Sequence, residues 1–131
     1  MKTKKGLILS LDKFITESLY EKNTGYYMSK NPFGKKGDFI TSPNISIFFS
    51  EMIAVWIISF WKNLKEPKKL NIIELGAGNG EMINVISKTF EKFPSFNNAC
   101  KIHILEKSPY LQKIQKEKLK NKNIFWINNL N

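Results

Sequence analysis

Apolar positions recur along the first half of the chain in ways that predict helices and loops. A spacing of three and four residues predicts a helix over 11–21 that Ser10 would cap. Residues 45–64 are apolar almost all round, which predicts a helix buried inside a globular protein. Between them we expect a short extended piece at 26–28 and a long loop, rich in glycine and proline, at 29–43.

The second half of the chain alternates between strand and helix patterns. Strands are predicted over 70–75, 101–106 and 123–127, helices from 81 to about 90–93 and from 108 to about 120, and loops at 76–80 and 94–99. Ser108 followed by Pro109 is a strong helix start. Strands that alternate with helices imply an α/β fold with a parallel sheet of about three strands, preceded here by a helical segment.

The composition limits the classes of protein that remain open. A chain of 131 residues with 42% apolar residues can form one small packed domain and is not typical of a disordered one. Cys100 is the single cysteine and His103 the single histidine, which excludes a disulfide framework and a zinc site of several thiolates or histidines. We expect both side chains to be partly buried in or beside a strand, and we expect no metal.

The net charge of +10 suggests nucleic-acid binding, but its origin weakens that interpretation. All 21 basic residues are lysine, and lysine, isoleucine and asparagine, which AT-rich codons encode, are all frequent. Residues 1–36 have 8 lysines and 3 acidic residues, 107–131 have 6 and 1, and the middle has 7 of each. Arginine, which makes most bidentate contacts to phosphates and bases, is absent. A basic binding module on the lysine-rich helix Lys113–Lys122 stays open as an alternative.

Two segments bear on targeting and membranes. The basic start of the chain precedes an apolar run, Gly6–Leu11, that is too short for a signal peptide, so a cytoplasmic protein is the default. The apolar stretch 45–61 has 17 residues with Glu51 near its middle, so we favour a buried helix over a membrane span.

The string IIELGAGNG, residues 72–80, is the most informative motif because it lies where a strand should turn into a helix. Its alternating glycines, Gly76, Gly78 and Gly80, suit a tight turn with positive φ and a backbone left bare for a ligand. A dinucleotide fingerprint would need glycine where Glu81 stands, and that charge would repel a pyrophosphate. The loop therefore suits a ligand without phosphates; an ordinary strand-to-helix turn is the alternative.

Two acidic residues complete this pattern. Glu74 precedes the glycine loop by two residues, and Glu106 ends the second predicted strand, where a carboxylate can accept hydrogen bonds from ribose hydroxyls. Carboxylates for a ribose and a cationic amine, with glycines along the nucleoside, are what an S-adenosylmethionine site requires. The predicted cofactor-binding residues are Glu74, Gly76, Ala77, Gly78, Gly80, Glu106, Thr41 and Ser42. Thr41, Ser42 or Ser46 could instead cap the following helix.

From Leu7 to Leu130 the chain resembles the N-terminal part of the MidA-like family of class I S-adenosylmethionine-dependent methyltransferases. The resemblance is carried by LDKFITESLY, GYY, GDFITSPNIS, FSEMIAVWIISFW, ELGAGNGEM and HILEKSPYLQKIQ. It implies a partial Rossmann-like sheet, with 1–69 as an N-terminal helical and loop segment and 70–131 as the first part of the cofactor-binding domain. The mitochondrial member methylates an arginine on a subunit of respiratory complex I and supports assembly of that complex. The resemblance thus implies a protein substrate, and the mitochondrial matrix in a eukaryote or the cytoplasm in a bacterium.

The chain also departs from the family pattern. The family more often has proline at the position of Ala77, arginine or another residue at Asn79, and glutamate at Asn44. A complete doubly wound sheet has about five or six strands. Because only about three are predicted here, we expect a truncated gene or an incomplete sequence.

Methyl transfer to an arginine also calls for a catalytic base. An arginine guanidinium loses a proton when it attacks a methyl donor, so a nearby carboxylate is expected. Asp38 and Glu51 are the candidates, although Asp38 could instead cap a turn beside Gly37. A further alternative is an assembly or interaction protein that keeps the fold without activity.

Overall fold

A three-stranded parallel sheet organises the chain. The computed structural model describes residues 8–120 and 122–130. The sheet has the order β1-β2-β3, with β1 at Leu70–Leu75, β2 at Cys100–Leu105 and β3 at Ile124–Ile127. The register pairs Leu70 with Cys100 and Ile102 with Ile124. The predicted α/β class, the parallel pairing and the three strands are confirmed.

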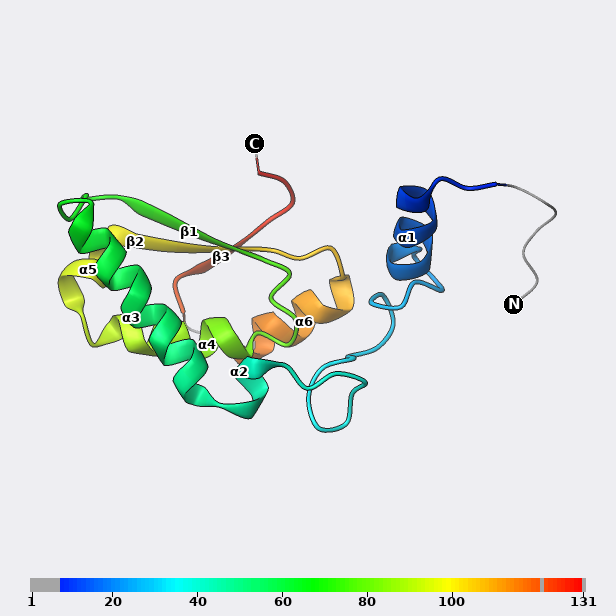
Figure 1. Cartoon of the computed structure of the whole chain (residues 1–131), viewed down its shortest axis with the longest axis horizontal. Coiled ribbons are helices and arrows are strands. Elements are labelled where there is room, and N and C mark those ends of the chain that lie inside the picture. The colour runs from blue at the N-terminus through cyan, green and yellow to red at the C-terminus, as the bar shows by residue number, and fades with distance from the viewer. Residues whose placement is uncertain (1–7, 121, 131) are drawn as a thin grey trace.

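Six helices accompany the sheet within the described residues. They are α1 (Leu11–Tyr20), α2 (Ser42–Ile45), α3 (Ile47–Asn63), α4 (Glu81–Glu91), α5 (Pro94–Ala99) and α6 (Pro109–Lys118). Figure 1 shows α3, α4 and α6 on one side of the sheet, with α1 set apart beyond the carboxyl ends of the strands. The helices α3, α4 and α6 therefore form a single layer against one face.

The core lies between that face and the helices α3 and α4. Its members are buried apolar side chains from these helices, α5 and the strands. They include Ala54, Ile58, Trp61, Ile83, Ile86, Phe90, Phe96, Ile102, Ile104 and Ile124. Phe96 stands edge-on to both Trp61 and Phe90, so the short helix α5 closes the end of the core opposite the glycine loop.

The predicted burial of the long apolar helix is wrong for α3. Only Ser50, Ala54, Ile58 and Trp61 are buried, whereas Phe48 is 72% and Trp56 65% exposed. The physical reason is that α3 meets α4 and the core along one stripe. The helix also begins at Ile47 instead of residue 45, because Ser46 is extended (φ −141°, ψ 125°) and separates it from α2.

The first strand, whose apolar run is typical of a strand buried on both faces, is covered on one face only. Its side chains alternate, with Leu70, Ile72 and Glu74 half-buried and Ile73 and Leu75 exposed. Alternate residues of a strand point to opposite faces, and the described helices cover only one of them. The continuous apolar run of β1 therefore belongs to a strand that is covered on one face, and not on both.

Other local predictions divide between confirmed and wrong. Ser108 caps α6, since its Oγ accepts the Leu111 N–H over 3.2 Å. Ser10 occupies the first capping position, but its side chain makes no capping hydrogen bond. Residues 26–28 form a turn instead of an extended piece, and 94–99 form α5 instead of a loop, because Pro94 suits a first helical turn.

Three further observations concern predictions about the whole chain. Cys100 is buried and His103 half-buried, both on β2 as expected. No helix in residues 8–120 and 122–130 is long and apolar enough to cross a bilayer. The start of the chain, for which we considered a signal peptide, lies partly outside the described residues. The division after residue 69 stays a prediction, although α3 shares its core with α4 and the sheet.

Candidate functional site

The glycine loop leaves β1 in left-handed conformations, as predicted. The φ angles of Gly76, Gly78 and Gly80 are +73°, +53° and +74°, values that other residues rarely adopt. The Gly76 N–H donates to the Leu105 carbonyl over 2.9 Å, so the loop begins where β1 and β2 are still paired. This pairing brings the ends of both strands, and the acidic residues on them, to one place.

Two cavities meet at this loop. The first, of about 170 Å³, is lined by Phe33, Thr41, Pro43, Asn44, Glu74, Gly76, Ala77, Gly78, Asn79, Glu81 and Met82. The second, of about 160 Å³, is lined by Tyr20, Tyr27, Phe33, Gly76, Gly78, Glu106 and Leu111. Phe33, Gly76 and Gly78 line both cavities, Glu74 lines only the first and Glu106 only the second.

Glu106 is a buried carboxylate that the protein itself holds in place. The residue is 8% exposed and directly follows β2. Its Oε1 accepts the Ser108 N–H over 2.9 Å, and its Oε2 accepts from Gln115 Nε2 over 3.2 Å. Each oxygen can accept a second hydrogen bond, so the carboxylate can still receive two hydroxyl donors.

Glu74 is the opposite case, because one of its oxygens is buried with nothing to bond. Its Oε2 has no hydrogen-bond partner among the residues that the structure describes. Burial, and secondarily the charge of Glu106, raise the pKa of Glu74 to about 7. A buried polar atom without a partner costs free energy, so a cationic or hydrogen-bonding group in the first cavity would suit it.

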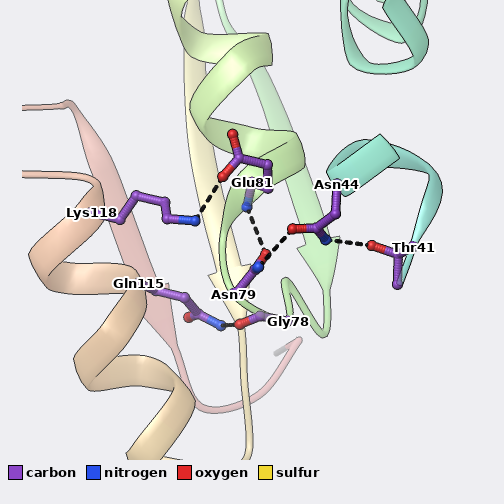
Figure 2. Close-up of polar contacts among 7 residues, drawn as sticks. All are labelled: Thr41, Asn44, Gly78, Asn79, Glu81, Gln115 and Lys118. Atoms are coloured by element: carbon purple, nitrogen blue, oxygen red, sulfur yellow. Dashed lines mark hydrogen bonds and ion pairs between the residues drawn. The ribbon is translucent and has the colours of Figure 1, made fainter. Parts of the chain in front are cut away.

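A chain of side-chain hydrogen bonds ties the loop to α2, as Figure 2 shows. Asn79 Nδ2 donates to Asn44 Oδ1 over 2.8 Å, and Asn44 Nδ2 donates to Thr41 Oγ1 over 2.7 Å. Asn44 thus joins the segment before α3 to the glycine loop, a role that sequence reasoning missed. It also retains a polar function where the family more often has glutamate.

Phe33 is the second residue that sequence reasoning missed. A Cβ on Gly78 would lie only 3.3 Å from the Phe33 ring, so the bare glycine lets that ring rest on the loop. Phe33 and Phe39 form an isolated bridge in which the Phe39 N–H donates to the Pro32 carbonyl over 2.8 Å. The only available signal was an aromatic residue inside a loop rich in glycine and proline.

The structure gathers most of the predicted cofactor-binding residues but not all. Glu74, Gly76, Ala77, Gly78 and Thr41 line the first cavity, and Glu106 lines the second with Gly76 and Gly78. Ser42, the first residue of α2, lines neither of these two cavities. Nor does Gly80, which faces Gln115 and Leu119 of α6.

The two candidate bases lie outside both cavities. Asp38 accepts hydrogen bonds from the Tyr26 hydroxyl and, over 2.6 Å, from Lys30 Nζ. These two partners, Lys30 first, lower the pKa of Asp38 and keep it ionised. The partners described for the Asp38 carboxylate are therefore two side chains, and not a backbone N–H of the turn beside Gly37. Glu51 lies half-buried in the second turn of α3.

Part of the lysine-rich segment is engaged within the chain. Lys118 Nζ lies 2.7 Å from Glu81 Oε2, and Lys122 Nζ lies 3.1 Å from Glu91 Oε1. Both pairs join the C-terminal end of α6 and the residues after it to α4. These lysines therefore serve internal ion pairs on this side of the molecule.

The fold matches that of a solved bacterial structure. The protein, from Burkholderia thailandensis, was crystallised with S-adenosyl-homocysteine. The match has a TM-score of 0.78 at 20% identity, and it covers 94% of this chain and 33% of that one. At this identity the likeness establishes a shared fold, which confirms the partial Rossmann-like sheet.

Sequence comparisons identify the family. The profile described as "Putative S-adenosyl-L-methionine-dependent methyltransferase" matches residues 52–131, and the chain belongs to that family. The chain is 37% identical over 118 residues to the protein arginine methyltransferase NDUFAF7, mitochondrial, of Xenopus tropicalis. It is 35% identical over 109 residues to the protein of the same name from Homo sapiens. The resemblance to the MidA-like family is thus confirmed.

The match covers only part of these relatives. The alignments include 88% and 82% of this chain but 27% and 25% of the Xenopus and human proteins. The chain therefore spans about a quarter of the length of these relatives.

Proposed function

We propose that this chain is the cofactor-binding part of an S-adenosylmethionine-dependent protein arginine methyltransferase. The observation that carries the proposal is the pair of carboxylates, Glu74 and Glu106, in two cavities that share the glycines of a loop with positive φ angles. Membership of the methyltransferase family supports it, as do relatives that are named protein arginine methyltransferases.

The residues present fit the cofactor by their chemistry. The cofactor would supply a methyl group on a sulfonium sulfur. Glu106 would accept hydrogen bonds from the ribose hydroxyls, since both of its oxygens keep acceptor capacity. The buried Oε2 of Glu74, which has no partner within residues 8–120 and 122–130, would accept from the cationic amine. Gly76 and Gly78 would leave the backbone open to the nucleoside. The chain's contribution is to hold and orient the donor.

The acceptor we propose is an arginine of a protein substrate. The names of the relatives support this, and a subunit of respiratory complex I is the finer proposal that the family resemblance suggests. The corresponding location is the mitochondrial matrix in a eukaryote or the cytoplasm in a bacterium. Asp38 and Glu51 stay the proposed acceptors of the guanidinium proton.

Calorimetric titration of the protein with S-adenosyl-homocysteine tests cofactor binding. We expect saturable binding by the parent protein and none by Gly78→Val, because a β-branched residue at φ +53° is strained and would meet the Phe33 ring. Lys88→Val, at an exposed position of α4, is the matched control and should bind like the parent. Unchanged affinity in Gly78→Val would reject the proposed site.

A second candidate function is an assembly or interaction protein without methyltransferase activity. The observation that favours it is that neither Asp38 nor Glu51 lines a cavity at the glycine loop. Transfer of a radioactive methyl group to an arginine peptide separates the two functions. Binding of the cofactor without transfer would favour the assembly function, and transfer would exclude it.

A further inference from the structure

The Gln115 side chain is fully buried and uses both ends of its amide. Its Nε2 donates to the Gly78 carbonyl over 2.8 Å and to Glu106 Oε2 over 3.2 Å. Its Oε1 accepts from Trp126 Nε1 over 2.9 Å. Figure 2 shows the amide reaching from α6 to the glycine loop. One side chain therefore connects α6, β3, the loop and the carboxylate of Glu106.

Gly80 makes room for this side chain. A Cβ at Gly80 would lie 3.4 Å from Gln115 Cγ and 3.7 Å from both the Gln115 Cα and Leu119 Cδ1. A Cβ would thus be in ordinary contact, whereas a side chain that extends beyond Cβ would meet Gln115 or Leu119. The third glycine of the motif therefore lies against α6 and lines neither cavity.

An apolar side chain could fill the same space without the free-energy cost of burying an amide, so the presence of glutamine needs an explanation. Burial of an amide costs free energy unless its donors and acceptor are bonded. Here both donated bonds go to groups at the predicted cofactor site, the Gly78 carbonyl and the Glu106 carboxylate. With Ser108 N–H on Oε1 and Gln115 on Oε2, the Glu106 carboxylate is held at both oxygens.

We propose that Gln115 is a positioning residue for the nucleoside. It holds the plane of the Glu106 carboxylate and the Gly78 carbonyl in the orientation that the ribose hydroxyls meet. The inference rests on the proposed function, because it concerns how the same site recognises the sugar. It adds α6, through one glutamine, to the elements that determine cofactor affinity.

The experiment compares two ligands, S-adenosyl-homocysteine and its analogue with a dideoxyribose, by calorimetry on the parent protein and three variants. Gln115→Met fills the same volume without the two donated hydrogen bonds. Trp126→Phe removes the hydrogen bond that the amide oxygen accepts and keeps both donations, so it reports on a change around Gln115 that leaves the two donated bonds in place. Lys113→Met changes an exposed position of α6 and is the matched control.

We expect the parent to prefer the ribose ligand by on the order of 100-fold, since two hydroxyls meet a charged acceptor. Gln115→Met should reduce that preference about tenfold, whereas Trp126→Phe and Lys113→Met should keep it within about twofold. If Gln115→Met does not fold, Gln115→Glu is used instead. Glutamate keeps the shape of the side chain but repels Glu106, so this variant should lose the preference for the ribose ligand.

Each remaining outcome decides the matter. An unchanged ribose preference in Gln115→Met or Gln115→Glu overturns the positioning role and leaves the proposed function standing. An equal loss of ribose preference in Trp126→Phe also overturns the positioning role, because that variant keeps the two hydrogen bonds that Gln115 donates. If the parent protein does not bind S-adenosyl-homocysteine, the proposed function and this inference both fail.

Discussion

Glu74 and Glu106 lie at the ends of neighbouring strands, yet the protein treats their carboxylates in opposite ways. Glu106 receives the Ser108 N–H and the Gln115 amide, one on each oxygen. Glu74 has a buried oxygen with no hydrogen-bond partner in the described part of the chain, and burial raises its pKa to about 7. The difference shows which part of the site is completed by folding and which part would be completed only by a ligand.

The two carboxylates also differ in what they do to the stability of the folded protein. The hydrogen bonds of Glu106 form when the chain folds, so its orientation is set before a ligand arrives. Glu74 instead lowers the stability of the folded protein at neutral pH, because its ionised form is poorly solvated. A site can thus contain one carboxylate that the fold stabilises and one that destabilises the fold.

Glu106→Leu should have the largest effect on this comparison. It removes the acceptor for the ribose and takes the carboxylate acceptor from two buried donors, the Ser108 N–H and one N–H of the Gln115 amide, whose nitrogen keeps its bond to the Gly78 carbonyl. We expect the affinity for S-adenosyl-homocysteine to fall on the order of 1000-fold. Calorimetric titration measures the loss, and Glu117→Leu, at an exposed position of α6, is the control. A loss below about fivefold would contradict the role of Glu106.

Glu74→Gln should stabilise the protein at neutral and higher pH. The folded protein binds this proton more tightly than the unfolded chain, because the pKa rises from 4.5 to about 7 on folding. The parent therefore loses stability as pH rises from about 4.5 to about 7, whereas the glutamine variant does not. Above that window the variant should be more stable by on the order of 3 kcal/mol.

Urea unfolding at a series of pH values measures the difference between Glu74→Gln and the parent. The two should converge below the usual glutamate pKa of 4.5, where the carboxyl is neutral in both states. Glu117→Gln, an exposed residue on α6, should follow the parent throughout. A constant gap between Glu74→Gln and the parent at every pH would show that ionisation of Glu74 is not the cause.

Gly80→Ala should have an intermediate effect, on stability more than on ligand binding. Alanine at φ +74° costs about 1–2 kcal/mol, whereas its Cβ would stand 3.4 Å from Gln115 Cγ, at ordinary van der Waals distance. We therefore expect lower stability in urea unfolding, with the affinity for S-adenosyl-homocysteine close to that of the parent. Gly76→Ala has similar backbone strain (φ +73°) and should lose similar stability, but Gly76 lines both cavities, so this variant should also bind the ligand more weakly. Equal affinity in the two variants would contradict the different places of Gly76 and Gly80 at the site.

Asp38→Asn should have the smallest effect on cofactor binding. The residue is exposed, pairs with Lys30 and Tyr26, and lies outside both cavities at the glycine loop. We expect its affinity for S-adenosyl-homocysteine to stay within about twofold of the parent. A change in the rate of methyl transfer with unchanged affinity would identify Asp38 as the proton acceptor, whereas weaker binding would contradict its placement.

The parts of the fold that could be predicted are those that local rules determine. Gly76 and Gly78 require a turn with positive φ, and Ser108 with Pro109 begins a helix wherever they stand. Burial could not be predicted in the same way. The apolar surface of α3 looks alike in sequence on all sides, but only the stripe of Ala54 and Ile58 meets other elements. Which face is covered depends on neighbours, not on the pattern.

The residues of the site also divide into those that local rules predict and those that depend on tertiary neighbours. Glu74 and Glu106 were predictable because both lie within two residues of a strand's carboxyl end, where parallel strands bring their ends together. Phe33 and Gln115 were not, because one depends on how the 29–43 segment folds back and the other on how closely α6 approaches the loop. Gln115 could be predicted to face inward, but not to donate to Gly78 and Glu106.

Phe33 has a consequence for how fast the site can fill. Its ring rests on Gly78 and borders both cavities, and it is anchored to a turn in which the Gly34 N–H donates to the Phe39 carbonyl over 2.9 Å. A molecule long enough to reach both acidic residues has to slide across that ring or swing it aside with its turn. Association is then expected to reach a ceiling at high ligand concentration, set by the motion of the turn and not by diffusion.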